Sequence, residues 1–459
     1  MLFHEFDYLI FLAVVVIVYW TLPHKWRTLF LLASSLTFYS ISSYQYLPLI
    51  IASTCIDYSA GLLVQNDKFK RYRGKFLFSS IFFNLAILFS YKYYDALIQL
   101  IANIYHVTLP PQYLLNSSLP LGVSFYTFQT MSYTIDCYRG KVKADKSFIN
   151  IFLYVTFFPQ LIAGPIERAG HLLTQIQSRQ YFNLQNIKEG LTLFVWGMAK
   201  KVYAADSLII VIENFYQQEK SNFYDIMLIG MTMVFRTYYD FNGYVDMARG
   251  AAKMLGFNLS INFRIFLLAK NVYQIWSHFW HVTLGTWIRD YIYIPFMDHV
   301  YKNHIAATLF SFLFVGLWHG PTLNWVAFGL FNGFFVVLHR YLLKKYPKLE
   351  NFIYLTMFPI YSFEGLFNYI DTWEKFRIIR LGFFDYSLNF YQFVSMFKFT
   401  FVAVAPFVFL ELYFEYKKDC DYYLKMGSKQ KALFVGYCLA LITVSSYYSE
   451  VREYFYFTF

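Results

Sequence analysis

Long apolar runs alternate with short polar segments along most of the chain. A membrane-spanning helix needs about 20 apolar residues. The runs that approach this length lie near residues 8–22, 28–44, 46–64, 76–94, 119–136, 148–164, 188–214, 223–239, 306–318, 324–344, 352–370, 394–414 and 432–448. We expect 119–136 and 306–318 to be broken or re-entrant, which requires that protein covers their backbone. The pattern predicts an all-α polytopic membrane protein with about eleven crossings.

Two longer segments interrupt this alternation. Residues 165–190 and 258–305 mix polar and aromatic side chains, and the second is rich in Trp, Tyr and His. Such composition is typical of interfacial or part-inserted helices. Because no internal repeat or soluble segment separates the runs, we expect a single membrane domain over residues 1–459.

The composition agrees with a protein of the bilayer. Of the 459 residues, 58% are hydrophobic and only 15% are charged, whereas a soluble domain carries about 25% charged residues. The aromatic share is 23%, and Tyr and Trp favour the membrane interface. The four scattered cysteines form no CxxC pair, so we interpret them as small buried hydrophobic residues.

The net charge of +11 comes largely from basic loops. Lys and Arg gather after the first, third and fifth apolar runs, near residues 25–27, 68–75 and 139–146, while residues 103–118 contain none. The positive-inside rule then predicts cytoplasmic basic loops and an outside N-terminus. No basic stripe with groove-reading spacing is present, so nucleic acid is not an expected partner. Charge order around the first run, acidic before and basic after, is the reverse of a signal peptide.

His319 is the sharpest candidate for chemistry. It ends an apolar run and is followed by Gly320, Pro321 and, five residues on, Asn324. An ionisable residue in such a position is costly and is usually functional. A buried, neutral imidazole is able to take a proton from an alcohol. The alternative is a histidine bonded to a backbone carbonyl where Gly320-Pro321 ends the helix.

A second histidine, His281, follows His278 by three residues and precedes Arg289 and Asp290. Three-residue spacing would place the two histidines on one helix face. Without a clear third ligand, they do not predict a metal site. We interpret His278 as a packing residue and keep an orienting or acceptor-binding role open for His281.

Several other polar positions lie within apolar runs. Asp240, Asn242 and Asp246 fall where one run ends, and we favour helix capping or pairing with arginine over acid–base chemistry. Lys200 and Lys201 also lie in an apolar run. We expect their side chains to extend toward the membrane interface, which is a simpler interpretation than an anion-binding site. An Asn-Ser-Ser match for glycosylation occurs at residues 116–118, but such matches are common by chance.

A series of short motifs in order resembles the membrane-bound O-acyltransferase family, in particular the branch of the bacterial alginate O-acetylase membrane subunits. The series is PLGVSFYTFQ (120–129), YRG (138–140), FFPQLIAGPI (157–166), GMAKKV (197–202), YDFNGY (239–244), WHVTL (280–284), WIRDY (287–291) and GLWHG (316–320). Each motif is weak alone, and the ordered set is specific. The resemblance covers nearly all of the chain to about residue 345 and is strongest over 119–345. The helices of 350–459 match less clearly.

The resemblance implies a ring of tilted helices around a thinned centre with a central tunnel. His319 stands at the family's catalytic position and His281 at its second site histidine. No metal or bound cofactor is implied, and the acyl donor is expected to be acetyl-CoA or a similar thioester. Candidate substrate-binding residues are Trp318, Asn324, Asp240, Asn242, Arg289 and Asp290.

The function that the resemblance implies is O-acetylation of a cell-surface or secreted polysaccharide across a bacterial inner membrane. The acceptor is then the polysaccharide itself or an extracytoplasmic protein that relays the acyl group. One alternative is transfer of D-alanine or another acyl group from a carrier protein. Another is a transporter or export component without chemistry, although no repeated halves are visible. The chain departs from the acetylase branch at two places. It has His278-Phe279 where Arg-Arg is usual, and Met297-Asp298 where Gly-Gly is common.

Overall fold

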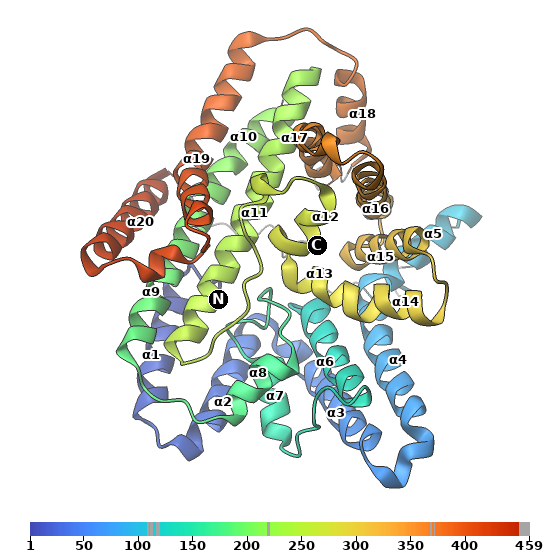
Figure 1. Cartoon of the computed structure of the whole chain (residues 1–459), viewed down its shortest axis with the longest axis vertical. Helices are drawn as coiled ribbons and strands as arrows, with labels where there is room; N and C mark the ends of the chain where they lie inside the picture. Colours follow the sequence, from blue (N-terminus) through green and yellow to red (C-terminus); the bar gives the residue numbers. More distant parts are fainter. Residues whose placement is uncertain are drawn as a thin grey trace. The chain divides into compact units, whose positions relative to one another are not determined.

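The computed structural model describes residues 1–107, 110, 113–115, 120–217, 221–367, 370 and 372–448. These residues are mostly helical and contain no strand (Figure 1). Internal contacts divide the chain into two compact units, one formed by Met1–Leu191 with Ala248–Ser260 and the other by Thr192–Met247 with Ile261–Phe459. The glycosylation match at 116–118 lies outside the described residues. The single membrane domain stays a prediction.

The first unit contains the helices that follow the N-terminus. They are α1 (Phe6–Thr21), α2 (His24–Ser43), η1 (Tyr44–Tyr46), α3 (Leu47–Val64), η2 (Asp67–Tyr72), α4 (Arg73–Lys92), α5 (Tyr94–Tyr105), α6 (Val123–Tyr138), α7 (Phe148–Thr156) and α8 (Ala169–Gln177). The buried Asp57 of α3 accepts hydrogen bonds from Ser80 at 2.5 Å, Asn84 at 2.8 Å and Thr134 at 2.8 Å. Because a buried carboxylate needs such partners, this contact fixes α3 against α4 and α6.

The second unit contains the candidate site. Helices α9 (Leu184–Ala199) and α11 (Phe223–Met254) have residues in both units. The others are η4 (Lys200–Ala205), α10 (Asp206–Tyr216), η5 (Phe266–Leu268), α12 (Val272–Gln274), η6 (Ile275–Phe279), α13 (Val282–Ile288), η7 (Arg289–Tyr293), α14 (Ile294–His299), α15 (His304–His319), α16 (Leu323–Lys345), η8 (Pro347–Leu349), α17 (Glu350–Phe367), α18 (Trp373–Gly382), α19 (Phe390–Tyr416), η9 (Tyr422–Lys425) and α20 (Ser428–Tyr448).

The structure changes several expected elements. Among the described residues, α6 and α15 run without interruption, so the break expected in 119–136 and 306–318 is not found there, and their re-entrance stays a prediction. In contrast, the run 148–164 is helical only to Thr156. Pro159 and Pro165, which lack a backbone N–H, lie in the irregular segment that follows. The run 188–214 contains a π-helical turn, η4.

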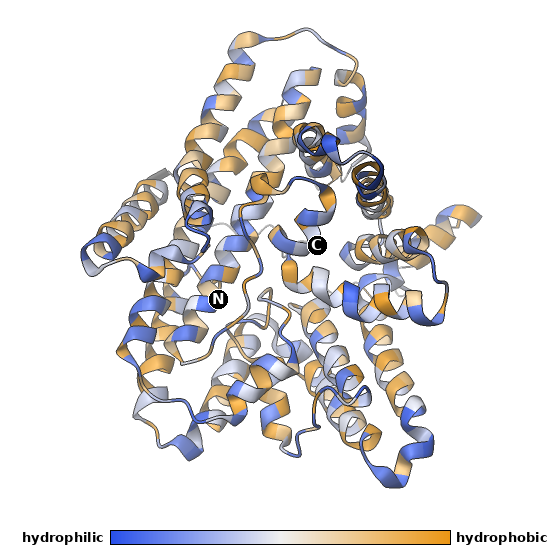
Figure 2. Ribbon diagram, in the orientation of Figure 1, coloured by the Kyte–Doolittle hydropathy of each residue, from blue (hydrophilic) through white to orange (hydrophobic). Residues whose placement is uncertain are grey.

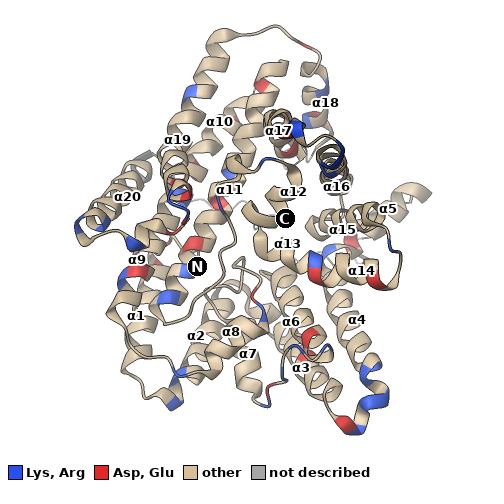
Figure 3. Cartoon of the chain, viewed as in Figure 1, with Lys and Arg blue, Asp and Glu red and all other residues tan. Residues whose placement is uncertain are grey.

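Helices long and apolar enough to cross a membrane occur in both units. By length and composition, these are His24–Val64, Asp67–Lys92, Leu323–Lys345 and Phe390–Tyr416, with the shorter apolar helices Phe6–Thr21 and His304–His319. Apolar residues cover most of α4, α19 and α20 (Figure 2), and charged residues are sparse along α15 and α19 (Figure 3). This is the pattern of a membrane protein. The ring of about eleven spans stays a prediction.

Candidate functional site

Close packing of α15 on α16 positions His319. A Cβ atom added at Gly316 would lie 2.2 Å from the backbone oxygen of Trp325, and one added at Gly329 would lie 2.3 Å from that of Phe312. Only glycine permits backbones to approach this closely. The two helices therefore meet in backbone contact one turn before His319, the last residue of α15.

Aromatic rings surround His319. Its imidazole stacks on Trp325 with centroids 4.7 Å apart and an interplanar angle of 17°. Phe328 meets its edge at 5.4 Å, and Trp318 lies 4.9 Å away. These contacts hold the ring in one orientation and remove part of its surface from water.

His281 lies in a strained backbone conformation. It is the N-cap of α13 with φ 46° and ψ 49°, a left-handed region that residues other than glycine rarely adopt. The conformation is stabilised by the neighbouring segment, because Val282 N–H donates to the Asn262 carbonyl at 2.9 Å. Backbone strain of this kind is concentrated at functional sites.

Asn262 determines which ring nitrogen of His281 carries the proton. The backbone N–H of Thr283 donates to Asn262 Oδ1 at 3.0 Å, and the Thr283 hydroxyl is 2.8 Å from the same atom. An N–H requires an acceptor, so this atom is the oxygen and not the nitrogen of the amide. His281 Nδ1, 3.3 Å away, must then donate to it. The Nε2 atom of a neutral His281 is therefore the basic nitrogen.

Burial keeps His281 neutral. Its ring is enclosed by Phe241 at 5.0 Å, Phe263 at 5.9 Å and Trp318 at 6.1 Å, measured between centroids. Because this surrounding disfavours a charged ring, burial lowers the pKa of His281 to about 3. At neutral pH the residue is a hydrogen-bonding group and a very weak base.

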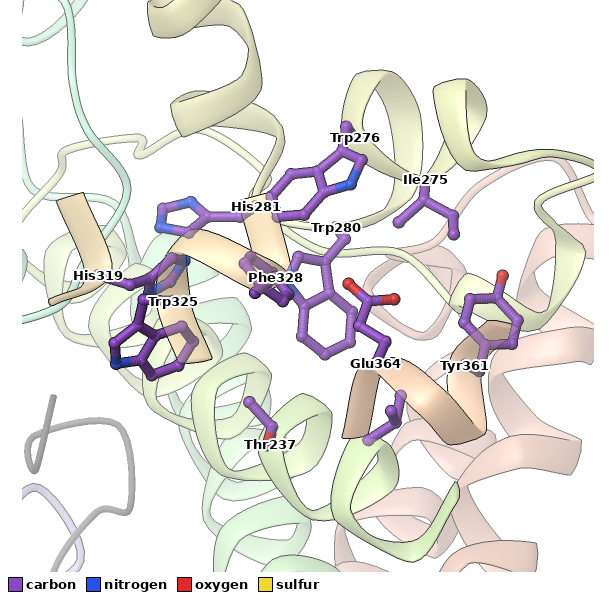
Figure 4. A pocket seen from close by; sticks show the side chains of 11 residues that line it. Thr237, Ile275, Trp276, Trp280, His281, His319, Trp325, Phe328, Tyr361 and Glu364 are labelled. Carbon is purple, nitrogen blue, oxygen red and sulfur yellow. The ribbon is translucent and has the colours of Figure 1, made fainter. Parts of the chain in front are cut away.

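The two histidines line one small cavity of about 40 Å³ (Figure 4). Its other lining residues are Val234, Thr237, Ile275, Trp276, Trp280, Trp325, Phe328, Tyr361 and Glu364. We call this cavity the histidine chamber. Its walls are mostly aromatic, and the Glu364 carboxylate points into the space from α17 (Figure 4). Asn332 is hydrogen-bonded to Glu364 and accepts the Trp276 indole N–H at 2.9 Å, which fixes this side of the wall.

None of the predicted substrate-binding residues lines the chamber. Trp318 contacts both histidine rings, and Asn324 lies half-buried beside Trp325. Arg289 and Asp290 form an ion pair of 2.8 Å at the start of η7 and lie away from the chamber walls.

Asp240 and Asn242 of α11 belong to a buried ion network that also includes residues of η4, α10 and α19. Lys201 Nζ lies 2.7 Å from Asp240 and 2.9 Å from Asp206. Lys200 Nζ lies 2.9 Å from Asp246 and 2.8 Å from Glu411, and Asn242 donates to Glu411 at 3.4 Å. Both lysines are buried, so the expectation that they reach the interface was wrong. The aspartates have the structural role that was expected, but they lie within α11 and pair with lysine, where a helix cap or an arginine partner was predicted.

Two features explain this ion network. Gly197 of α9 and Gly243 of α11 are in backbone contact, since a Cβ at Gly197 would lie 2.5 Å from the Gly243 oxygen. The π-helical turn η4 then places both lysines on the inside. Charges buried in this way require partners, and sequence spacing alone does not show which helices supply them.

His278 and His281 do not share a helix face, which corrects the expectation from their spacing. The π-helical turn η6 ends at Phe279, and the chain is extended at Trp280 before His281 begins a new helix. Within the described part of the chain, no group of three or more His, Cys, Asp or Glu side chains is arranged to hold a metal ion.

Sequence reasoning missed Asn262, Trp276, Trp325 and Glu364. Trp325 follows the predicted Asn324 directly, and Trp276 lies in the Trp-rich segment 258–305. Asn262 and Glu364 carry no local signal, since each reaches the site only through tertiary packing.

Comparisons with known proteins agree with the family resemblance of the motif series. The sequence profile of the membrane-bound O-acyltransferase family matches residues 7–352. The chain is 32% identical over 338 residues to a probable alginate O-acetylase of Pseudomonas syringae pv. tomato, covering 72% of this chain and 64% of that protein. It is 30% identical over 387 residues to a peptidoglycan O-acetyltransferase of Helicobacter pylori, covering 77% of this chain and 71% of that protein.

A more distant relative is a teichoic acid D-alanyltransferase of Bacillus subtilis, 24% identical over 262 residues, with 52% of this chain and 64% of that protein covered. The match to the Pseudomonas syringae protein covers slightly less than two thirds of the length of that protein. The family profile covers most of this chain and includes both histidines of the chamber. The chain belongs to the membrane-bound O-acyltransferase family.

Proposed function

We propose that this chain transfers an acetyl group from a cytoplasmic thioester, acetyl-CoA or a similar donor, to a hydroxyl of a cell-surface or secreted polysaccharide. The observation that carries the proposal is the shared chamber of His281 and His319. Two relatives with names that specify O-acetyl transfer to alginate and to peptidoglycan support it.

His319 acts as the general base. A base works best when its pKa is near the operating pH, and the pKa of His281, about 3, makes that ring a poor proton acceptor. His281 instead accepts a hydrogen bond at Nε2 and orients the acceptor hydroxyl. Asn262 is a positioning residue, because it acts through His281.

The reaction requires two proton transfers, one to His319 and one from it. His319 removes the proton from the acceptor hydroxyl as its oxygen attacks the thioester carbonyl carbon. The C–S bond of the tetrahedral intermediate then breaks, and the thiolate receives the proton from His319. Aromatic walls exclude water, which would otherwise hydrolyse the thioester.

The size of the chamber favours a short acyl group. A cavity of about 40 Å³ has room for roughly three water molecules. A two-carbon acetyl group fits such a space. The acceptor presents one hydroxyl to the chamber, or an extracytoplasmic relay protein takes the acetyl group on to the polymer. The site of action is the bacterial inner membrane, with the N-terminus outside.

The test is the ester-linked acetate content of surface polymers. Cells that carry the native chain are compared with cells that carry His319→Ala or His299→Ala at matched membrane levels. His299 is exposed and lies away from the chamber. We expect acetate to fall to background with His319→Ala and to be unchanged with His299→Ala. Equal acetate in all three strains would refute the proposal.

Glu364 favours one second candidate, transfer of an aminoacyl group such as D-alanine. Its carboxyl group lines the chamber and is hydrogen-bonded to Asn332. An ammonium group on the acyl moiety would pair with a carboxylate at this place. The Bacillus relative, named as a D-alanyltransferase, is consistent with this candidate. Analysis of the same polymers for ester-linked alanine distinguishes it from acetyl transfer.

A further inference from the structure

Two carboxylates of α19 contact residues that pack around the segment before His281. Glu411 and Glu415 are four residues apart, so their side chains leave the same face of the helix. Both side chains are largely buried. Both residues lie beyond 7–352, the part of the chain that the family profile matches. The chemistry described above gives α19 no role.

Glu411 fixes the ring of Tyr238. The Tyr238 hydroxyl donates to Glu411 Oε2 at 3.3 Å, and the Lys200 ammonium holds the other carboxylate oxygen at 2.8 Å. The Tyr238 ring packs against that of Trp280 with centroids 5.9 Å apart. A buried hydroxyl needs an acceptor. Because this acceptor is itself held by an ion pair, the Tyr238 ring has one position against Trp280.

Glu415 reaches the same segment through Arg264. Nε of Arg264 donates to Glu415 Oε1 at 2.7 Å, and a terminal nitrogen of the same guanidinium contacts the second carboxylate oxygen. Paired bonds of this kind fix the plane of the guanidinium. That group lies 5.7 Å from the centroid of the Phe279 ring, and the Arg264 backbone N–H donates to the Phe279 carbonyl at 2.8 Å. Arg264 therefore connects α19 to the residue before Trp280.

The two connections meet at the residues directly before His281. Phe279 and Trp280 precede it, and Trp280 lines the histidine chamber (Figure 4). The left-handed backbone of His281 persists only where its surroundings hold it. On the far side of the ring, Val282 is bonded to Asn262. Contacts at Phe279 and Trp280 thus complete the support of His281 from both directions along the chain.

We propose that Glu411 and Glu415 are positioning residues of the acyl-transfer site. Each acts on the orientation of His281 through the residue that it anchors, Tyr238 or Arg264. Neither carboxylate touches the reacting groups. This inference rests on the proposed acyl transfer and adds to its site a helix that lies outside the matched family profile.

The experiment compares Tyr238→Phe with its matched control Tyr239→Phe. Each change removes one buried hydroxyl beside the same oxygen of Glu411, at 3.3 Å and 3.5 Å, so both should lower the thermal midpoint by a similar amount. The Tyr239 ring stacks on Phe235, whereas the Tyr238 ring packs against Trp280. Glu411 itself is kept, because a second buried charge depends on it.

Glu415→Gln tests the second connection. Its control is Glu350→Gln, at an exposed ion pair of 3.2 Å with Lys270. Two properties are measured for every variant. One is kcat and KM for acetyl-CoA in acetyl transfer to isolated surface polymer, by membranes with matched amounts of protein. The other is the fluorine NMR signal of Trp280 in purified protein labelled with fluorotryptophan, assigned by its loss in Trp280→Phe.

We expect Tyr238→Phe and Glu415→Gln to shift the Trp280 signal and to lower kcat by about tenfold with KM unchanged, because a misplaced group impairs the chemical step and not binding. Tyr239→Phe and Glu350→Gln should do neither. An unmoved Trp280 signal, or a native kcat in both anchor variants, would overturn the inference. Failure of the proposed function is distinguishable, since the native protein would then transfer no acetate while the Trp280 signal still moved in Tyr238→Phe.

Discussion

The side-chain oxygen of Asn262 lies 3.3 Å from Nδ1 of His281, and the same oxygen accepts the backbone N–H of Thr283. One amide thus fixes both the tautomer of the ring and the first turn of α13. His281 presents Nε2 as a result. The geometry of the chamber depends on a residue that the motif series does not include.

Replacement of Asn262 by Ala should therefore impair turnover. Without Oδ1, the ring loses its tautomer preference, and the buried Thr283 N–H loses an acceptor. We expect kcat to fall by about tenfold to hundredfold, less than the roughly 10²–10⁴-fold that a proton-transfer group itself contributes. Asn262→Asp keeps the acceptor and should recover part of the rate, but with a new dependence on pH, because a nearby carboxylate raises the pKa of His281. The control is Asn186→Ala, at a half-buried residue of α9. Equal rates for all variants would exclude a positioning role of Asn262.

Acid should destabilise the protein through His281. Its pKa is about 3 when folded and about 6.5 when unfolded, so the unfolded chain binds more protons between these values. Stability contributed by the neutral ring is present above pH 6.5 and is lost as the pH falls toward 3. We expect the thermal midpoint of the native protein to fall more steeply over this range than that of His281→Asn. Asparagine tolerates the left-handed backbone at this position, and parallel curves would contradict the prediction.

The buried ion network allows a test by charge removal. Lys201→Met leaves Asp206 and Asp240 without their lysine contact, and breaking a buried pair costs about 3–5 kcal/mol. We expect a large drop in the thermal midpoint of the purified protein. Adding Asp240→Asn should restore part of it, because one uncompensated charge is removed. A double variant less stable than the sum of the two single losses would argue against the direct pairing of Lys201 with Asp240.

The sequence predicted the helical membrane character and singled out the two histidines that the structure places on one cavity, but it did not predict how that cavity is assembled. His319 was recognisable because an ionisable residue at the end of an apolar run is rare. His281 required the ordered motifs. Trp325 could not be ranked above Trp318 or Asn324, since the irregular residues after His319 return the chain onto its ring. The partners of Lys200 and Lys201 come from α10, α11 and α19, and no local periodicity encodes such contacts.

The last prediction concerns the backbone contact that positions His319. In Gly316→Ala, the new Cβ would lie 2.2 Å from the Trp325 carbonyl oxygen. A backbone atom cannot rotate away as a side chain does, so α15 and α16 must separate, and the stacking of His319 on Trp325 is lost. We expect acetyl transfer to fall by at least tenfold and the thermal midpoint to drop, since overpacking typically costs about 1–3 kcal/mol.

Gly436→Ala in α20 is the matched control, because no atom lies within 4 Å of its added Cβ. There the change replaces glycine with a better helix former and should leave the protein as stable or more stable by about 0.5–1 kcal/mol. Full activity in Gly316→Ala would mean that His319 does not depend on the α15–α16 contact. Loss of activity in both variants would instead indicate that the helices are generally sensitive to added methyl groups. Loss of activity in Gly316→Ala alone would link the packing of α15 on α16 to the position of His319.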